Sequence, residues 1–147
     1  RPLNPLPSKD AAMPRKLYVN LPVKDLERSV DFFAALGFSF NPTFTNENAA
    51  AMIVNDLTGV MLLQEAFFST FTPKAICDAK EAVEALLAIS LDSRADVDDF
   101  VARALAAGAT EQGEATDHGF MYERGFVDLD GHNWGPFWMD ESQFPVH

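Results

Sequence analysis

The chain has few of the residues that disulfide chemistry or nucleic-acid binding require. It contains one cysteine in 147 residues, so no disulfide can form within it. Its 11 basic residues stand against 22 acidic residues, and the net charge of −11 argues against DNA or RNA as a partner. No apolar run approaches the roughly 20 residues that a membrane helix needs, and no secretory signal is seen. We therefore expect a cytoplasmic protein that binds neither nucleic acid nor membrane.

Common catalytic motifs are missing as well. The sequence has no Ser/His/Asp spacing, no phosphate-cradling glycine loop and no dinucleotide fingerprint. Cys77 lies beside Asp78 without a basic neighbour, so we predict a structural thiol rather than a nucleophile. His118 is the best single candidate for a base or a ligand donor, because imidazole titrates near neutral pH. His132 follows a turn glycine and is expected in solvent, and His147 is terminal.

The chain is rich in apolar and aromatic residues. Hydrophobic residues make up 48% of it and 13 residues are phenylalanine, which is enough for a sizeable core. The densest stretch is residues 124–140, RGFVDLDGHNWGPFWMD, which predicts a strand, a tight turn and a second strand. Asp-x-Asp-Gly favours such a turn, because aspartate bonds its own backbone and Gly131 supplies a positive φ. Trp134 and Trp138 bury large areas, so we expect a central core strand or a pocket wall.

A strand, a capped helix and a glycine occur twice in the same order. The first strand alternates apolar and polar side chains, Asp25 is positioned to cap the following helix, and Gly37 to end it. The second copy has Ser93 as its cap and Gly108 at its helix end. Strand–helix–strand–strand–strand, twice over, is the simplest account. Successive strands without helices between them favour an α+β fold.

These patterns divide the chain into five parts. Residues 65–74 carry three phenylalanines without alternation, and we expect them to form a lid or a crossing loop. Proline-rich residues 1–12 are expected to be a mobile tail or an extended arm. The parts are a flexible N-terminal tail (1–14), a first module (15–74), a linker (75–84), a second module (85–140) and a C-terminal tail (141–147).

Two segments resemble those of a known superfamily. Residues 20–29, NLPVKDLERS, with the Leu36-Gly37-Phe38 that follows, resemble the opening of a vicinal oxygen chelate module. Asp128-Leu129-Asp130-Gly131-His132 resembles its closing hairpin. This superfamily contains glyoxalase I, bleomycin-resistance proteins and extradiol dioxygenases, and the chain is most similar to small bacterial predicted lactoylglutathione lyases. The resemblance implies two βαβββ modules that form a cup-shaped mixed sheet, often completed in a homodimer.

The resemblance also implies four positions for a divalent metal. They correspond to Tyr18, to one residue within Leu63–Glu65, to Leu86 and to Gly135. The sequence does not choose between Leu63, Gln64 and Glu65. Leucine and glycine offer no donor atom and neutral tyrosine is a poor one, whereas a divalent centre needs roughly three or four protein ligands. We therefore expect no metal and no other cofactor.

Three functions remain open from the sequence. The first is binding of a small, perhaps cationic, molecule in the cup, as in bleomycin-resistance proteins, with catalytic residues unknown. The second is a glyoxalase-type lyase or isomerase with an atypical site, and the third is a non-catalytic structural or regulatory dimer. An apolar pocket with a few polar groups is the usual small-molecule site. The expected lining residues are Tyr18, Asn20, Gln64, His118, Tyr122 and Trp134.

Overall fold

A computed structural model describes residues 14–143 of the chain. The expectations for residues 1–12 and for His147 lie outside these described residues. The first module forms a four-stranded sheet in the order β1-β4-β3-β2, with β1 parallel to β4 and the other pairs antiparallel. Its elements are β1 (Leu17–Val23), α1 (Leu26–Ala35), β2 (Ser39–Asn41), a 3-10 turn (Pro42–Phe44), β3 (Ala49–Ile53) and β4 (Thr58–Gln64).

The second module repeats this arrangement. β5 lies parallel to β10, and β10 pairs antiparallel with β8 and β9, which in turn pair with β7 and β6. The predicted α+β fold of two βαβββ modules is confirmed. The elements are β5 (Leu86–Ser90), α3 (Arg94–Ala106), β6 (Thr110–Glu111), β7 (Thr116–Asp117), β8 (Met121–Glu123), β9 (Phe126–Val127), β10 (Asn133–Met139) and a final 3-10 turn (Glu141–Gln143).

Both helices begin where the sequence predicts. The Asp25 carboxylate accepts a hydrogen bond from the Arg28 amide at 3.2 Å, and the Ser93 hydroxyl accepts one from the Asp96 amide at 3.0 Å. Each bond satisfies an amide that the helix itself leaves unpaired. α3 has 13 residues and α1 has 10, so the helix of the second copy is about one turn longer.

Pro136 explains why the inner strand of the second sheet is divided into β8 and β9. The register of β10 with both pieces is continuous, and it sets Pro136 opposite Arg124. The Arg124 amide still donates to the Pro136 carbonyl at 3.1 Å. Proline has no amide hydrogen, so the reciprocal bond cannot form and the ladder is interrupted at this point.

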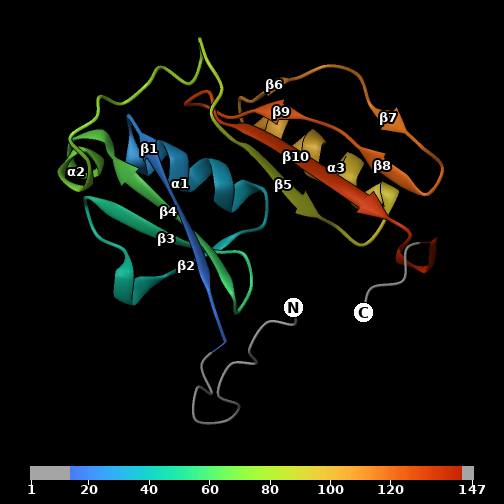
Figure 1. Ribbon diagram of the computed structural model, residues 1–147, viewed down its shortest axis with the longest axis horizontal. Helices are drawn as coiled ribbons and strands as arrows, with labels where there is room; N and C mark the ends of the chain where they lie inside the picture. The colour runs from blue at the N-terminus through green and yellow to red at the C-terminus, as the bar shows by residue number, and fades with distance from the viewer. Residues whose placement is uncertain (1–13, 144–147) are drawn as a thin grey trace, which may run out of the picture.

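The two modules share one aromatic core. Figure 1 shows them side by side, with α1 behind the first sheet and α3 behind the second. Phe33 of α1 packs on Trp134 of β10 with ring centroids 5.3 Å apart, and Phe38 packs on Phe100 of α3 at 5.9 Å. Phe33 and Trp134 are buried. The modules are therefore joined by packed rings as well as by the linker.

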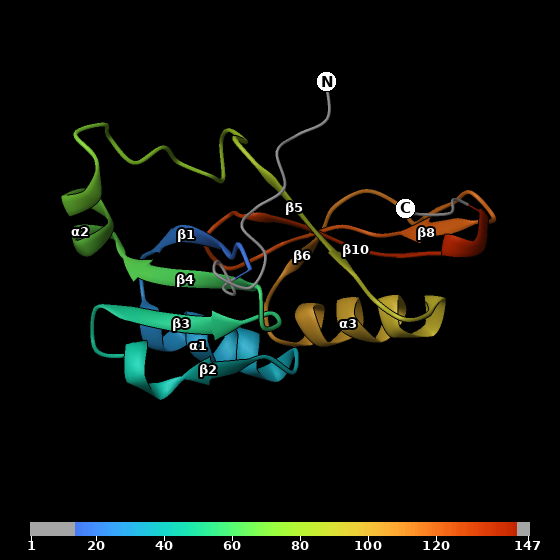
Figure 2. The same ribbon diagram turned by 60° about the horizontal axis from the view of Figure 1, so that its bottom comes forward.

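The segment after β4 begins with two short helical turns. These are α2 (Glu65–Phe68) and a 3-10 turn (Ser69–Phe71), where Phe67 and Phe71 meet edge to face at 5.1 Å. From here the chain crosses to β5 along one side of the molecule (Figure 2). The crossing predicted for residues 65–74 thus starts as helix, and Phe71 is exposed. None of the helices in residues 14–143 has the length and apolar character to span a membrane.

Candidate functional site

The candidate site lies on the face of the first sheet that is turned away from α1. Successive side chains of a strand point to opposite faces, and the alternate residues of β1 and β4 that enter the core are Leu21, Val23, Val60 and Leu62. Tyr18, Asn20 and Met61 therefore occupy the other, open face. A hollow of about 380 Å³ lies there, which is within the range of small-molecule pockets.

Small side chains make this hollow deep. Gly59 is opposite Tyr18 in the β1–β4 register and Ala51 is opposite Met61, so the floor lacks bulk. The Tyr18 ring lies over Gly59, because an added Cβ there would be 3.0 Å from Cδ1 and 3.1 Å from Cε1. Phe44 of the 3-10 turn also lines the hollow. Tyr18 is 56% exposed and Phe44 is 64% exposed, so both rings face solvent.

The second sheet has a matching open face. Trp134 and Phe126 point into the core, so Gly135 and the residues in phase with it point away from α3. In the parallel register Gly135 is opposite Ala88, and Leu86 of the same strand is 76% exposed. Each module thus presents an uncovered sheet face that carries apolar side chains.

The four positions implied for a metal do not suit one. Tyr18 and Leu63 lie on the open face of the first module, and Leu86 and Gly135 on that of the second. This set offers a single phenol oxygen, whereas a divalent ion needs roughly three or four protein donors. Within residues 14–143, no three His, Cys, Asp or Glu side chains gather closely enough to hold a metal ion.

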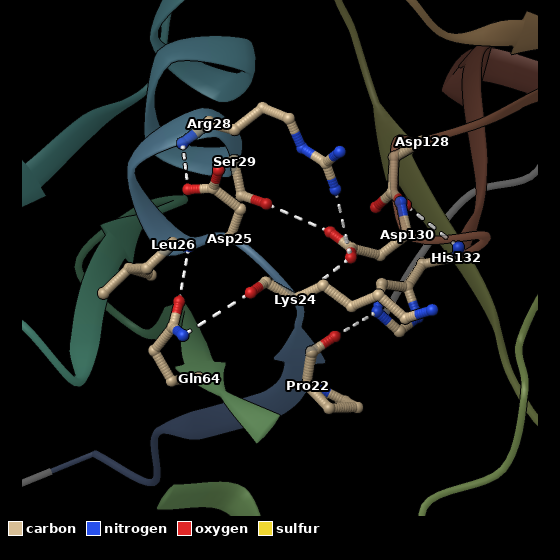
Figure 3. A network of polar contacts seen from close by, with 10 residues as sticks. All are labelled: Pro22, Lys24, Asp25, Leu26, Arg28, Ser29, Gln64, Asp128, Asp130 and His132. Carbon is tan, nitrogen blue, oxygen red and sulfur yellow. Dashed lines mark hydrogen bonds and ion pairs between the residues drawn. The ribbon is translucent and has the colours of Figure 1, made fainter. Parts of the chain in front are cut away.

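The structure decides between Leu63, Gln64 and Glu65. Leu63 pairs with Ala49, and both are buried outside the main core, so Leu63 takes the open-face position. Gln64 turns toward α1, where its carbonyl oxygen accepts from the Leu26 amide and its amide nitrogen donates to the Lys24 carbonyl at 3.5 Å (Figure 3). Glu65 begins α2. The Gln64 amide is thus occupied in ordering the helix start.

Trp134 and Tyr122 also point toward the helix side. The Trp134 indole donates to Asp128 Oδ2 at 3.0 Å within the shared core. The Tyr122 hydroxyl donates to Asp98 Oδ1 of α3 at 2.6 Å. This bond lowers the pKa of the Asp98 carboxyl and raises the pKa of the Tyr122 phenol. Of the six expected lining residues, only Tyr18 and Asn20 share the hollowed face.

Arg124 forms part of the same helix-side network. Its guanidinium donates to Asp98 at 3.0 Å and also to Glu111 of β6, and its side chain is only 18% exposed. The Glu111 hydrogen bond is the main cause that raises the pKa of Arg124. The structure places this side chain largely beneath other side chains. It ties three elements together rather than facing a ligand.

His118 lies at the turn between β7 and β8. Its amide donates to the Met121 carbonyl at 2.7 Å, and its ring stacks on Phe120 with centroids 6.1 Å apart. The preceding Asp117 accepts from the Gly119 amide, which chiefly lowers the pKa of its carboxyl, and from Arg94. This turn and α2 lie on opposite sides of the molecule in both views (Figures 1 and 2). Within one chain, His118 is therefore remote from Gln64 and Glu65.

The closing turn makes contacts between the modules that the sequence did not indicate. Asp130 accepts from the Lys24 amide and from the Ser29 hydroxyl, each at 3.0 Å, and lies 3.5 Å from the Arg28 guanidinium (Figure 3). His132 was expected in solvent, but its Nε2 is 2.8 Å from the Pro22 carbonyl and therefore carries the proton. The turn thus joins the second module to the start of α1. Nothing near it in sequence could have indicated partners about one hundred residues away.

Cys77 lies in the crossing segment and is exposed. It lines a second hollow, of about 490 Å³, with Lys24, Asp130 and His132. An exposed thiol does not pack a core. The predicted structural role therefore has no support from burial.

Comparison with known proteins identifies the fold. Residues 15–55 match the family model described as bleomycin resistance protein-like N-terminal. A hypothetical protein from S. aureus is 26% identical, with a TM-score of 0.74 over 88% of this chain and 97% of its own. A glyoxalase/bleomycin resistance protein/dioxygenase family enzyme from Burkholderia phytofirmans is 19% identical, with a TM-score of 0.68 over 83% and 96%. The chain has the glyoxalase/bleomycin-resistance/dioxygenase fold.

The predicted resemblance to the vicinal oxygen chelate superfamily is confirmed. A further solved structure with this fold aligns over a similar share of the chain. The fosfomycin resistance protein FosX from Mesorhizobium loti is 16% identical, with a TM-score of 0.66 over 91% of this chain and 100% of its own. No curated protein matches the chain significantly. At these identities the likeness establishes the glyoxalase/bleomycin-resistance/dioxygenase fold and leaves the activity to the site residues.

Proposed function

We propose that this protein binds a small, positively charged molecule on the open face of its sheets, without a metal ion. The observation that carries the proposal is that residues without good metal-donor atoms occupy the positions implied for metal ligands. Tyr18, Leu86 and Gly135 occupy positions that the resemblance implies for metal ligands, and Tyr18 borders a hollow with exposed aromatic rings. The net charge of −11 favours a cation, because an acidic protein attracts positive ligands.

We further propose that a second copy of the chain completes the cup. Ile53 of β3 is 40% exposed and Leu86 of β5 is 76% exposed, and these apolar side chains lie on the open faces of the first and second sheets. Exposed apolar side chains gathered on one surface mark a site of interaction. A cup closed between two chains would surround a ligand that a single open face can only touch.

Metal analysis and turnover test the proposal against a glyoxalase-type lyase. After exhaustive dialysis the protein should contain far less than one Zn²⁺, Ni²⁺ or Fe²⁺ per chain. It should not turn over the glutathione–methylglyoxal hemithioacetal when these ions are added. A Gly135→Glu variant should gain no metal affinity, since Tyr18 and Leu86 still lack normal donors. Stoichiometric metal, or turnover, would establish the lyase instead.

A ligand screen tests the proposal against a purely structural dimer. Binding to the folded state raises the melting temperature, and the rise grows with the ratio of the ligand concentration to Kd. We expect stabilisation by at least one class of small cation and none by small anions of equal size. A cup filled by its own side chains would respond to neither group, and that result would support a structural role.

A further inference from the structure

The strongest unexplained feature of the open face is the Tyr18 side chain. It stands on an edge strand, is 56% exposed, and its ring lies over Gly59. No partner for its hydroxyl is found among residues 14–143. A buried aromatic contributes to stability by its packing, but a ring that remains more than half exposed contributes little in this way.

The hollow beside Tyr18 forms a slot that is lined by two aromatic rings, Tyr18 and Phe44. Among its other lining residues, Ala51 and Gly59 are small and Met61 is flexible. An extra Cβ at position 59 would displace the tyrosine ring, so the glycine fixes the depth of the slot. Glycine inside a strand marks a close approach of another group, and here that group is the Tyr18 ring.

The charges beside the slot are one of each sign. Asp56, in the turn between β3 and β4, and Lys16, just before β1, both line it. Asp56 has no ion-pair partner among residues 14–143. The field of the whole chain is acidic, which favours a cation over an anion at this opening.

We infer that Tyr18 is a specificity-determining residue that stacks on the flat aromatic ring of a cationic ligand, in the slot that Phe44 also lines. This inference rests on the proposed function and names the class of ligand. Aromatic pairs gain from offset or edge-to-face contact, and a cationic ring adds attraction to the electron-rich tyrosine face. At a position where the resemblance implies a metal ligand, this chain thus has a tyrosine ring that selects flat ligands.

Titration calorimetry with two cations tests the inference on the full chain. Proflavine is a flat aromatic cation and spermidine is a flexible aliphatic one. Proflavine should bind the wild-type protein, and Tyr18→Ala should weaken it about tenfold or more, the loss expected for a well-formed stacking contact. Tyr18→Phe should bind within about twofold of wild type, because it keeps the ring. Tyr18 is exposed, so both variants should keep the wild-type melting temperature.

A matched control separates the slot from general stickiness. Phe71 is 68% exposed and lies outside the slot, so Phe71→Ala should leave proflavine affinity unchanged. Equal losses from Phe71→Ala and Tyr18→Ala would overturn the inference, as would wild-type affinity in Tyr18→Ala. Binding of spermidine but not of proflavine would overturn the inference and leave the proposed function standing. Binding of neither cation would overturn both.

Discussion

Asp128 and Asp130 stand two positions apart in one turn and have different tasks. The Asp128 carboxylate points inward, where it accepts from the Trp134 indole and from the amides of Asp130 and His132. Burial outweighs these bonds and raises the pKa of this carboxyl. Asp130 instead faces the first module, where its side chain is only 7% exposed and accepts from the Lys24 amide and the Ser29 hydroxyl. Within this one turn, the Asp128 carboxylate therefore binds the following strand, β10, and the Asp130 carboxylate binds the first module.

Replacing Asp128 by asparagine should destabilise the protein by about 1–3 kcal/mol. The amide oxygen can still accept from the Asp130 and His132 amides, but the amide NH₂ would then face the Trp134 indole N–H. Two donors in contact leave a buried indole N–H unpaired. Denaturant unfolding followed by tryptophan fluorescence measures the loss. A Ser142→Ala variant, at an exposed hydroxyl bonded only to Asp140, is the control and should unfold at nearly wild-type denaturant concentration.

The effect of Asp128 on stability should depend on pH with a defined sign. Its pKa is raised in the folded state, so the folded chain holds this proton more tightly than the unfolded chain. The resulting contribution to the free energy of unfolding is complete below the ordinary carboxyl pKa. It is lost as the pH rises through the raised pKa of the folded state. Asparagine does not titrate, so the stability advantage of wild type over Asp128→Asn should shrink across this interval. Unfolding curves from pH 3 to pH 7 measure it, and an advantage that grows with pH would contradict the assignment.

Local residues of this chain were predictable because their partners are close in sequence. Asp25, Ser93 and Asp128 bond to amides within four positions, and the sequence identified all three tasks. Asp130 bonds to Lys24 and Ser29 across 106 and 101 positions. Such a contact leaves no periodic pattern, since it depends on how the modules pack.

At the scale of elements, the crossing segment is anchored on the closing turn. Gly131 has φ +94°, and a Cβ added to it would lie 2.7 Å from the backbone of Ala79 and Lys80. The absence of a side chain thus serves two needs, a left-handed turn and a backbone contact with the crossing segment. Its neighbours Asp130 and His132 hold the first module at the same turn.

Gly131→Ala should be more destabilising than Gly113→Ala. Both glycines have positive φ, so both variants incur the left-handed strain of about 1–2 kcal/mol. A Cβ at Gly113 meets nothing within 4 Å, whereas a Cβ at Gly131 must push rigid backbone away. We expect an additional cost of about 1–3 kcal/mol for Gly131→Ala, the range for overpacked sites. Thermal unfolding of both variants measures the difference, and equal losses would show that the crossing segment is not held there.

The strand that follows this turn shows why part of the site escaped prediction. β10 carries apolar residues on both faces, so its sequence does not alternate and does not indicate which residues face the core. Trp134 enters the core and Gly135 takes the open face, which only the pairing with Leu87 and Ala88 reveals. On β1 the apolar and polar residues do alternate, and there Tyr18 and Asn20 were assigned to the same face correctly.

At the scale of the whole molecule, the shared ring cluster predicts that the modules unfold together. Phe33 is 2% exposed and contacts Trp134 of the other module. Phe33→Ala should cost about 3–5 kcal/mol, because truncation leaves a cavity in a packed core. Tryptophan fluorescence reports the second module and far-ultraviolet circular dichroism reports both. The two signals should shift to the same lower midpoint, and separate transitions would show that the modules are independent.

The proposed second copy makes a prediction for one exposed residue. Leu86→Asp places a charge on the open face of the second module, where a partner would bury it. Sedimentation velocity should give a dimer for the wild type and a monomer for this variant. Val83→Asp, at a 61% exposed residue of the crossing segment, is the control and should remain a dimer. A wild-type chain that sediments as a monomer at all concentrations would refute the proposal.

The contact between the closing turn and the start of α1 also has a consequence for synthesis. A ribosome releases Lys24 and Ser29 more than one hundred residues before Asp130, and Pro22 is 110 residues ahead of His132. While the nascent chain is incomplete, the first helix therefore lacks the carboxylate that meets its first turn, and Phe33 lacks the indole on which it packs. The first module therefore lacks these contacts until residues 130–134 have been synthesised.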